Sequence, residues 1–230
     1  MSEDRSLDIV GVGKLAEAVP DQVWTSLVDT ACSTFKQLIS PLTAITSGTG
    51  RLIEAKFDRL VDAEKVIASQ TMSRATDKAL RSSRKRKNEP KPSIILKVIE
   101  DSSTEVDTTL RELWTNLVAN EFVDGSVHPE FVRILSRISA VDAQRLIEIA
   151  QESEQKLPIK LALEILSLLN ARISISANAR IFISADEPTT FIDVHLSNLN
   201  LIKRSDGMWK LTVTGKAFLE AVSDPSIEAT

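Results

Sequence analysis

The sequence has few of the residues that disulfide-linked, metal-binding and membrane-spanning proteins depend on. Among its 230 residues there are one cysteine (Cys32), two histidines and no tyrosine. One cysteine cannot form an internal disulfide, and two histidines cannot build a His-rich metal cage. No run of about 18 apolar residues occurs, and the opening MSEDRSLD lacks a hydrophobic signal core. We therefore expect a reduced, cytoplasmic protein without a cofactor.

Aromatic residues are also scarce, at 4% of the chain, while hydrophobic residues make up 43%. A core must therefore be built from Leu, Ile, Val and Ala, a composition that favours helices. The sequence predicts a mainly α fold with a helical N-terminal pair, followed by a helical bundle that ends in a winged-helix-like β-hairpin module.

The N-terminal pair is predicted from apolar residues that recur at steps of three and four. Asp21 can cap a first helix, which Pro41 breaks or kinks, and a turn at 47–50 leads into one longer helix with an apolar stripe from Leu52 to Ala79. The two helices could pack against each other, or the first could lie on a membrane surface. Lys36 is the only basic residue on its polar face, so the membrane is the weaker alternative.

The middle of the chain carries strong signals for helix ends. Thr104 is a good cap for a helix that the Asp124-Gly125 turn stops, and His128-Pro129 opens the next one. Ser139 begins a third helix with Asp142 at the capping-box position.

Patterns in the last third of the sequence predict the winged-helix-like module. Alternating isoleucines at 173–183 indicate a hairpin, 191–199 a helix, Asp206-Gly207 the turn of a second hairpin, and 214–222 a closing helix. The predicted divisions are an N-terminal tail (1–20), an amphipathic helical pair (21–84), a basic Pro-containing linker (85–93), a helical core with the winged-helix-like end (94–222) and a disordered tail (223–230).

Positive charge is concentrated between residues 74 and 91. This stretch contains eight Lys or Arg residues and two acidic ones, whereas the whole chain has a net charge of −4. The densest part is a patch of Arg81, Arg84, Lys85, Arg86 and Lys87. Such a patch could make weak contacts with nucleic acid or a membrane surface, or it could be a solvated helix end beside a linker.

Candidate catalytic residues are few. The segment GVGK at 11–14 lacks the full spacing of a phosphate-binding loop. Four residues cluster around one predicted loop: Glu121, Asp124, His128 and Glu130. Carboxylates with an imidazole could bind a divalent metal or move a proton; alternatively His128 caps its helix and the carboxylates lie in water. The sequence places no nucleophile beside them, so we favour a non-enzymatic protein.

Residues 109–150 carry the most specific pattern of the chain. They contain LRELWTNLVAN, an Asp-Gly loop leading into VHPEFVRIL, and SRISAVDAQRLIEIA. This segment resembles the Abi-alpha family, the abortive-infection proteins of bacterial phage defence, and weaker similarity extends over residues 20–222. The resemblance implies a phage-defence protein that acts as an interaction or effector module on a protein partner from phage or host. It leaves self-association open and assigns no catalytic role to His128.

A winged-helix transcriptional regulator is the alternative function. Residues 189–222 hold four basic and three acidic residues, and the candidate recognition helix at 191–199 has no Lys or Arg. A DNA-reading face usually needs a clear basic surplus. We therefore expect no specific DNA binding.

Overall fold

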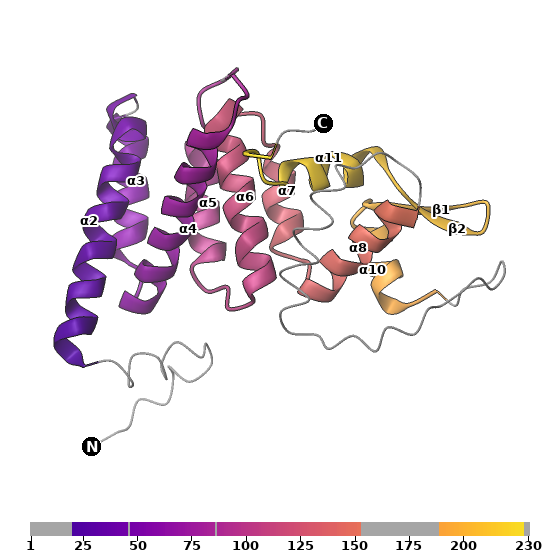
Figure 1. The fold of residues 1–230 in the computed structure, drawn as a ribbon, viewed down its shortest axis with the longest axis horizontal. Coiled ribbons are helices and arrows are strands. Elements are labelled where there is room, and N and C mark those ends of the chain that lie inside the picture. The colour runs from indigo at the N-terminus through magenta and orange to yellow at the C-terminus, as the bar shows by residue number, and fades with distance from the viewer. Residues whose placement is uncertain (1–19, 46, 86, 153–188, 228–230) are drawn as a thin grey trace.

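The helices stand side by side in a row that ends in a small hairpin (Figure 1). The computed structural model describes residues 20–45, 47–85, 87–152 and 189–227. The helices are α2 (Asp21–Ile45), α3 (Ser47–Asp58), α4 (Asp62–Arg81), α5 (Pro92–Ser102), α6 (Thr108–Asp124), α7 (Pro129–Leu135), α8 (Ala140–Glu152), α10 (Phe191–Asn198) and α11 (Val213–Ala221), and the strands are β1 (Ile202–Ser205) and β2 (Met208–Leu211). The predicted mainly α fold is confirmed.

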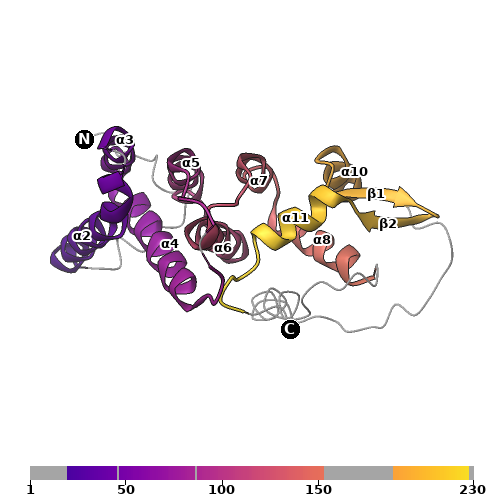
Figure 2. The same cartoon turned by 90° about the horizontal axis from the view of Figure 1, so that it is seen from above.

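Helix α6 is the central element of the row. It contacts α4, α5, α7 and α11, and Figure 2 shows α5, α6 and α7 nearly end-on beside one another. Trp114, Leu117 and Val118 are fully buried on α6, and nearly all of its residues are inaccessible to solvent. A helix enclosed in this way loses the simple two-faced pattern of a surface helix.

The N-terminal end of the row differs from the sequence prediction in two respects. Helix α2 runs past Pro41 to Ile45, because an internal proline removes one hydrogen bond but need not end a helix. The predicted turn at 47–50 lies within α3, and the single long helix is in fact α3 and α4. The break falls at Val61, whose N–H donates to the Glu64 carboxylate and so begins α4.

Helices α3 and α4 nevertheless bury their apolar residues in one core. Phe57 of α3 stacks on Phe35 of α2, with ring centroids 3.7 Å apart, and Met72 of α4 belongs to the same cluster. The apolar stripe therefore continues across the break, which is why periodicity alone predicts one helix.

Most of the predicted helix ends in the middle of the chain are confirmed. Gly125 ends α6 in the left-handed conformation (φ +61°), and His128 and Pro129 begin α7. Ser139 and Asp142 exchange the hydrogen bonds of a capping box before α8. The cap of α6 was predicted wrongly, because Asp107 rather than Thr104 accepts from the free N–H groups of the first turn.

The C-terminal module consists of α10, the antiparallel pair β1–β2 and α11. Ile202 pairs with Leu211 and Ser205 with Met208, so the predicted turn Asp206-Gly207 joins the strands, with positive φ at both turn residues. Gly215 lies against the Leu201 carbonyl, where a Cβ atom would approach the oxygen to 2.0 Å. The hairpin predicted at 173–183 lies outside the described residues.

The predicted linker and the predicted C-terminal tail both make contacts with the rest of the structure. In the linker, the Asn88 N–H donates to the Asp124 carbonyl at 3.0 Å and Pro90 is buried. In the predicted disordered tail, Asp224 and Pro225 are buried, so disorder is wrong for residues 223–227. The division into separate domains stays a prediction. Within the part of the chain that the structure describes, no helix is long and apolar enough to cross a bilayer.

Candidate functional site

The predicted loop between α6 and α7 uses its carboxylates to hold backbone groups. Glu121 is fully buried, and its two carboxylate oxygens accept from the Lys91 N–H and, at 3.1 Å, from the Val127 N–H. The Asp124 carboxylate accepts from the N–H and the hydroxyl of Ser126. Burial raises the pKa of Glu121, and the hydrogen bonds and charge of Lys91 partly oppose that rise. Both side chains therefore fix the chain around the end of α6.

The other two loop residues lie at the start of α7. His128 accepts a hydrogen bond from the Glu130 N–H through Nδ1 at 3.1 Å, which is the capping role, and the Glu130 carboxylate pairs with exposed Arg133 at 3.0 Å. The four predicted residues are close in the sequence, but the structure gives each of them different hydrogen-bond or ion-pair partners. No group of three or more potential metal ligands occurs in the described ranges.

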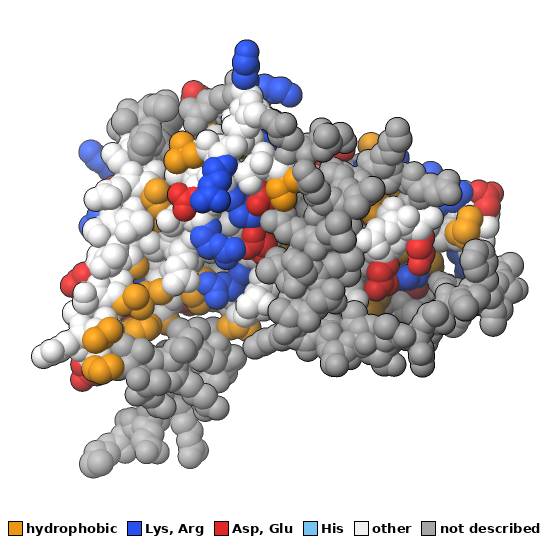
Figure 3. All heavy atoms as spheres, in the orientation of Figure 1, with side chains coloured by type: hydrophobic (Ala, Val, Ile, Leu, Met, Phe, Trp, Pro, Cys, Tyr) orange, Lys and Arg blue, Asp and Glu red, His pale blue; other side chains and the backbone are white. Residues whose placement is uncertain are grey.

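The predicted basic patch is partly tied to α6. Arg84 donates to the Asn120 side chain and lies 3.8 Å from the Asp124 carboxylate. Arg81, Lys85 and Lys87 are exposed, and Arg86 lies outside the described residues. Lys and Arg side chains gather near the middle of the face in Figure 3, with Asp and Glu side chains beside them.

The most extensive polar cluster was not predicted from the sequence. Helix α6 carries polar residues at every fourth position, and helix α4 presents Arg74 and Lys78 at the same spacing, with Arg84 following just after the end of α4. Residues four apart lie on one face of a helix, so two polar stripes meet where α4 and α6 pack. We call this cluster the polar seam: Arg74, Lys78 and Arg84 with Glu112, Asn116, Asn120 and Asp124.

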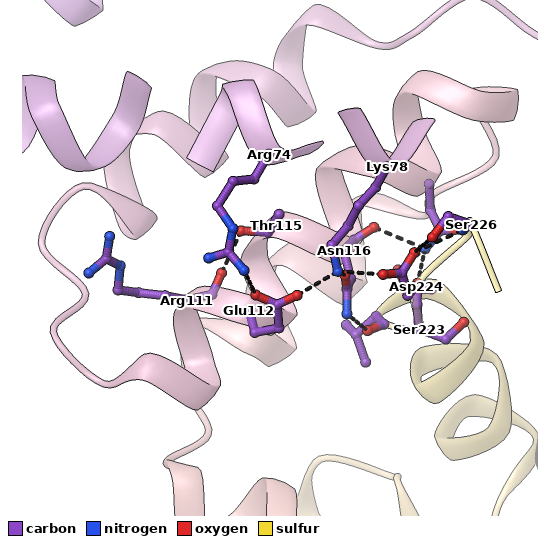
Figure 4. Close-up of polar contacts among 12 residues, drawn as sticks. Arg74, Lys78, Arg111, Glu112, Thr115, Asn116, Ser223, Asp224 and Ser226 are labelled. Carbon is purple, nitrogen blue, oxygen red and sulfur yellow. Dashed lines mark hydrogen bonds and ion pairs between the residues drawn. The ribbon is translucent and has the colours of Figure 1, made fainter. Parts of the chain in front are cut away.

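Lys78 occupies the centre of the polar seam (Figure 4). Its ammonium donates to the Glu112 carboxylate, to Asn116 Oδ1 at 2.6 Å and to Asp224 Oδ2 at 2.6 Å. An ammonium has three N–H donors, so all three are used. Arg74 pairs with the other oxygen of Glu112. The side chain of Lys78 is only 13% exposed, which removes it from most solvent screening.

The two asparagines of the seam hold the end of α11. Asn116 Nδ2 donates to the Val222 carbonyl at 3.0 Å, and Asn120 Nδ2 donates to the carbonyls of Ala221 and Ser223 at 3.0 and 2.7 Å. The last carbonyls of a helix have no partner within the helix, so α6 supplies the donors that α11 lacks.

Asp224 then joins this end to α4. Its Oδ1 accepts from the Ser226 N–H and hydroxyl at 2.8 and 2.7 Å, which leaves Oδ2 for Lys78. Burial alone would raise the pKa of Asp224, but the hydrogen bonds from Lys78 and Ser226 outweigh it and lower the pKa. The carboxylate is therefore charged at neutral pH.

A second buried ion pair fixes the C-terminal module to α8. The Arg145 guanidinium donates to Asp193 Oδ1 at 3.0 Å, and Asp193 also accepts from the N–H and hydroxyl of Thr190. Burial would raise the pKa of Asp193, yet these hydrogen bonds lower it. Beside this pair, α10 leaves two apolar side chains in solvent, Phe191 (83% exposed) and Val194 (44% exposed).

The polar seam offers fixed donors and charges, and its donors are satisfied by other seam residues and by residues 221–224. The sequence signal for it was the four-residue spacing of Glu112, Asn116, Asn120 and Asp124, which apolar periodicity overlooks.

One family model matches this chain. The model described as abortive infection alpha matches residues 63–210, from the first turn of α4 to strand β2. The matched segment includes the α4 and α6 sides of the polar seam but not Asp224. No curated protein and no solved structure matches the chain.

Proposed function

Because the chain belongs to the abortive infection alpha family, we propose that it limits phage propagation as a non-enzymatic interaction module. The family match over residues 63–210 is the observation that carries this proposal. The chain would act in the cytoplasm, on a protein of the phage or of the host. The local structural roles of Glu121, Asp124 and His128 support an interaction role over a catalytic one.

The C-terminal module supports a protein partner over DNA. In the winged-helix alternative, α10 would be the recognition helix, but it exposes two apolar side chains, Phe191 and Val194. Phosphate contacts need Lys, Arg or other hydrogen-bond donors, whereas exposed aromatic residues are typical of protein interfaces. We therefore propose that α10 contributes to the partner surface.

A phage challenge tests the proposed function. Expressed in a susceptible bacterium, the intact protein should reduce plaque counts or burst size across part of a phage panel. Trp114→Asp should abolish protection, because it places a charge in the fully buried core. If the intact protein is expressed and protects against no phage of a broad panel, the proposal is wrong.

A pair of surface variants tests the location of the partner surface. Phe191→Asp and Val23→Asp each place a charge at an exposed position, 83% and 56% exposed, at opposite ends of the row. Both should fold like the wild type, and we expect only Phe191→Asp to lose protection. Sequence-dependent retention of the protein on duplex DNA at physiological salt would instead favour the regulator.

A further inference from the structure

The segment after α11 lies across α6 and reaches α4. Residues 221–223 give their carbonyls to Asn116 and Asn120, and Asp224 gives its carboxylate to Lys78. Figure 4 shows Asp224 pointing at Lys78 from one side while Glu112 approaches from the other. The short stretch 221–224 thus contacts both α6 and α4, which are far from it in the sequence.

The seam donates hydrogen bonds to this stretch, and all the acceptors are oxygen atoms. The three carbonyls belong to the backbone, and the fourth group is a carboxylate. Any peptide with an acidic side chain offers the same two kinds of acceptor, so these donors would serve an acidic peptide of another protein equally well.

The charge balance also favours an anionic peptide. Without Asp224, three cations of the seam (Arg74, Lys78 and Arg84) face two carboxylates (Glu112 and Asp124). Asp224 supplies the missing negative charge. When Asp224 leaves, Lys78 keeps only the Glu112 carboxylate, which it shares with Arg74, so the seam then favours the binding of another anion.

The seam can be reached from solvent. The side chains of Arg74 and Arg84 are 53% and 45% exposed, whereas Lys78 lies deeper at 13%. An incoming anionic segment can therefore contact the exposed guanidinium groups first, and then compete with Asp224 for Lys78.

We propose that residues 223–227 form a latch over an acidic-peptide site, and that an acidic segment of the protein partner displaces Asp224 from Lys78. The latch keeps the site filled until that partner is present. This inference rests on the proposed function, because it names the chemistry of the partner and the step that controls its binding.

A binding experiment with the full-length chain tests the latch. The probe is a fluorescein-labelled peptide with the sequence of residues 218–230, FLEAVSDPSIEAT, measured by fluorescence anisotropy. The peptide can bind only those molecules in which the site is open. Its apparent affinity is therefore its intrinsic affinity multiplied by the open fraction. We expect Asp224→Ala to bind the peptide about tenfold or more tightly than the wild type, a difference of about 1.4 kcal/mol.

Four controls locate the binding in the seam. A peptide with Ala in place of its Asp should lose most of its affinity, and Asp206→Asn, which breaks an exposed Lys210 pair instead, should leave the protein like the wild type. Adding Lys78→Met to Asp224→Ala should abolish the gain. Since that change could unfold the chain, Arg74→Gln at a half-exposed position is the milder test, and it should reduce the gain at unchanged circular dichroism.

Three results would overturn the latch. The first is equal affinity of Asp224→Ala and the wild type for the peptide, and the second is equal affinity of Asp224→Ala for the peptides with and without Asp. Stronger binding of single-stranded DNA than of the peptide to Asp224→Ala would assign the site to nucleic acid and also reject the proposal. The binding assay involves no phage, so failure of the wild type to protect would reject the proposed function separately.

Discussion

Replacing Lys78 by Met tests how strongly the polar seam stabilises the fold. The change keeps most of the side-chain volume but removes the ammonium that Glu112, Asn116 and Asp224 share. Two buried carboxylates then lose their closest common cation. Because the site is mostly buried, water can replace the lost ammonium as a partner of these carboxylates only in part.

The expected cost follows from the remaining partners. Breaking a buried ion pair by removing one side costs about 3–5 kcal/mol. Glu112 keeps Arg74 and Asp224 keeps Ser226, so we expect a value near the lower end, about 3 kcal/mol. For a chain of this size, 1 kcal/mol corresponds to about 2–4 °C, so the Tm should fall by about 6–12 °C.

Thermal and urea unfolding, followed by circular dichroism, measure this change. Lys210→Met is the matched control, because Lys210 pairs with Asp206, which is 78% exposed, and exposed pairs contribute about 0–1 kcal/mol. If Lys78→Met lowered the stability no more than Lys210→Met, the seam would not be a stabilising network and the reasoning from its burial would be wrong.

Three further variants have defined outcomes. Gly215→Ala should cost about 1–3 kcal/mol in urea unfolding, because its Cβ would press on the Leu201 carbonyl, whereas Lys216→Ala beside it should have little effect. The stability that Asp224 adds over Asp224→Asn should be full above about pH 4 and should shrink as the pH falls through the lowered pKa of Asp224; a difference that grew in acid would contradict the sign of that shift. His128→Ala should cost about 1 kcal/mol as a lost cap and leave phage protection intact; lost protection at unchanged stability would identify the loop as a working site.

The helix ends show which structural features local sequence can predict. His128, the Ser139–Asp142 box and the Asp206-Gly207 turn each act on residues within four positions, and all three were predicted. The cap of α6 was missed because Thr104 and Asp107 both satisfy the composition rule, and only the backbone geometry shows that Asp107 accepts from Thr109 and Leu110.

The polar seam shows where local patterns fail. Its two helix stripes are visible as spacings of four, but nothing in either helix says that they face each other. Lys78 lies in the matched region near its start, whereas Asp224 lies beyond its end. No short window of sequence therefore contains both partners of this contact. The same contact holds Asp224 in a packed segment, although the sequence predicts a disordered tail there.

The basic patch illustrates the same difficulty for charge. Counted along the chain, residues 74–91 have a large positive excess, which is typical of a surface for polyanions. In the structure, Arg74 and Lys78 meet the Glu112 carboxylate, and Arg84 lies near that of Asp124, both supplied by α6. The exposed excess is therefore smaller than the sequence count. Since nucleic-acid affinity depends on the cations that remain free to contact phosphates, we expect weaker nucleic-acid binding than the sequence count alone predicts.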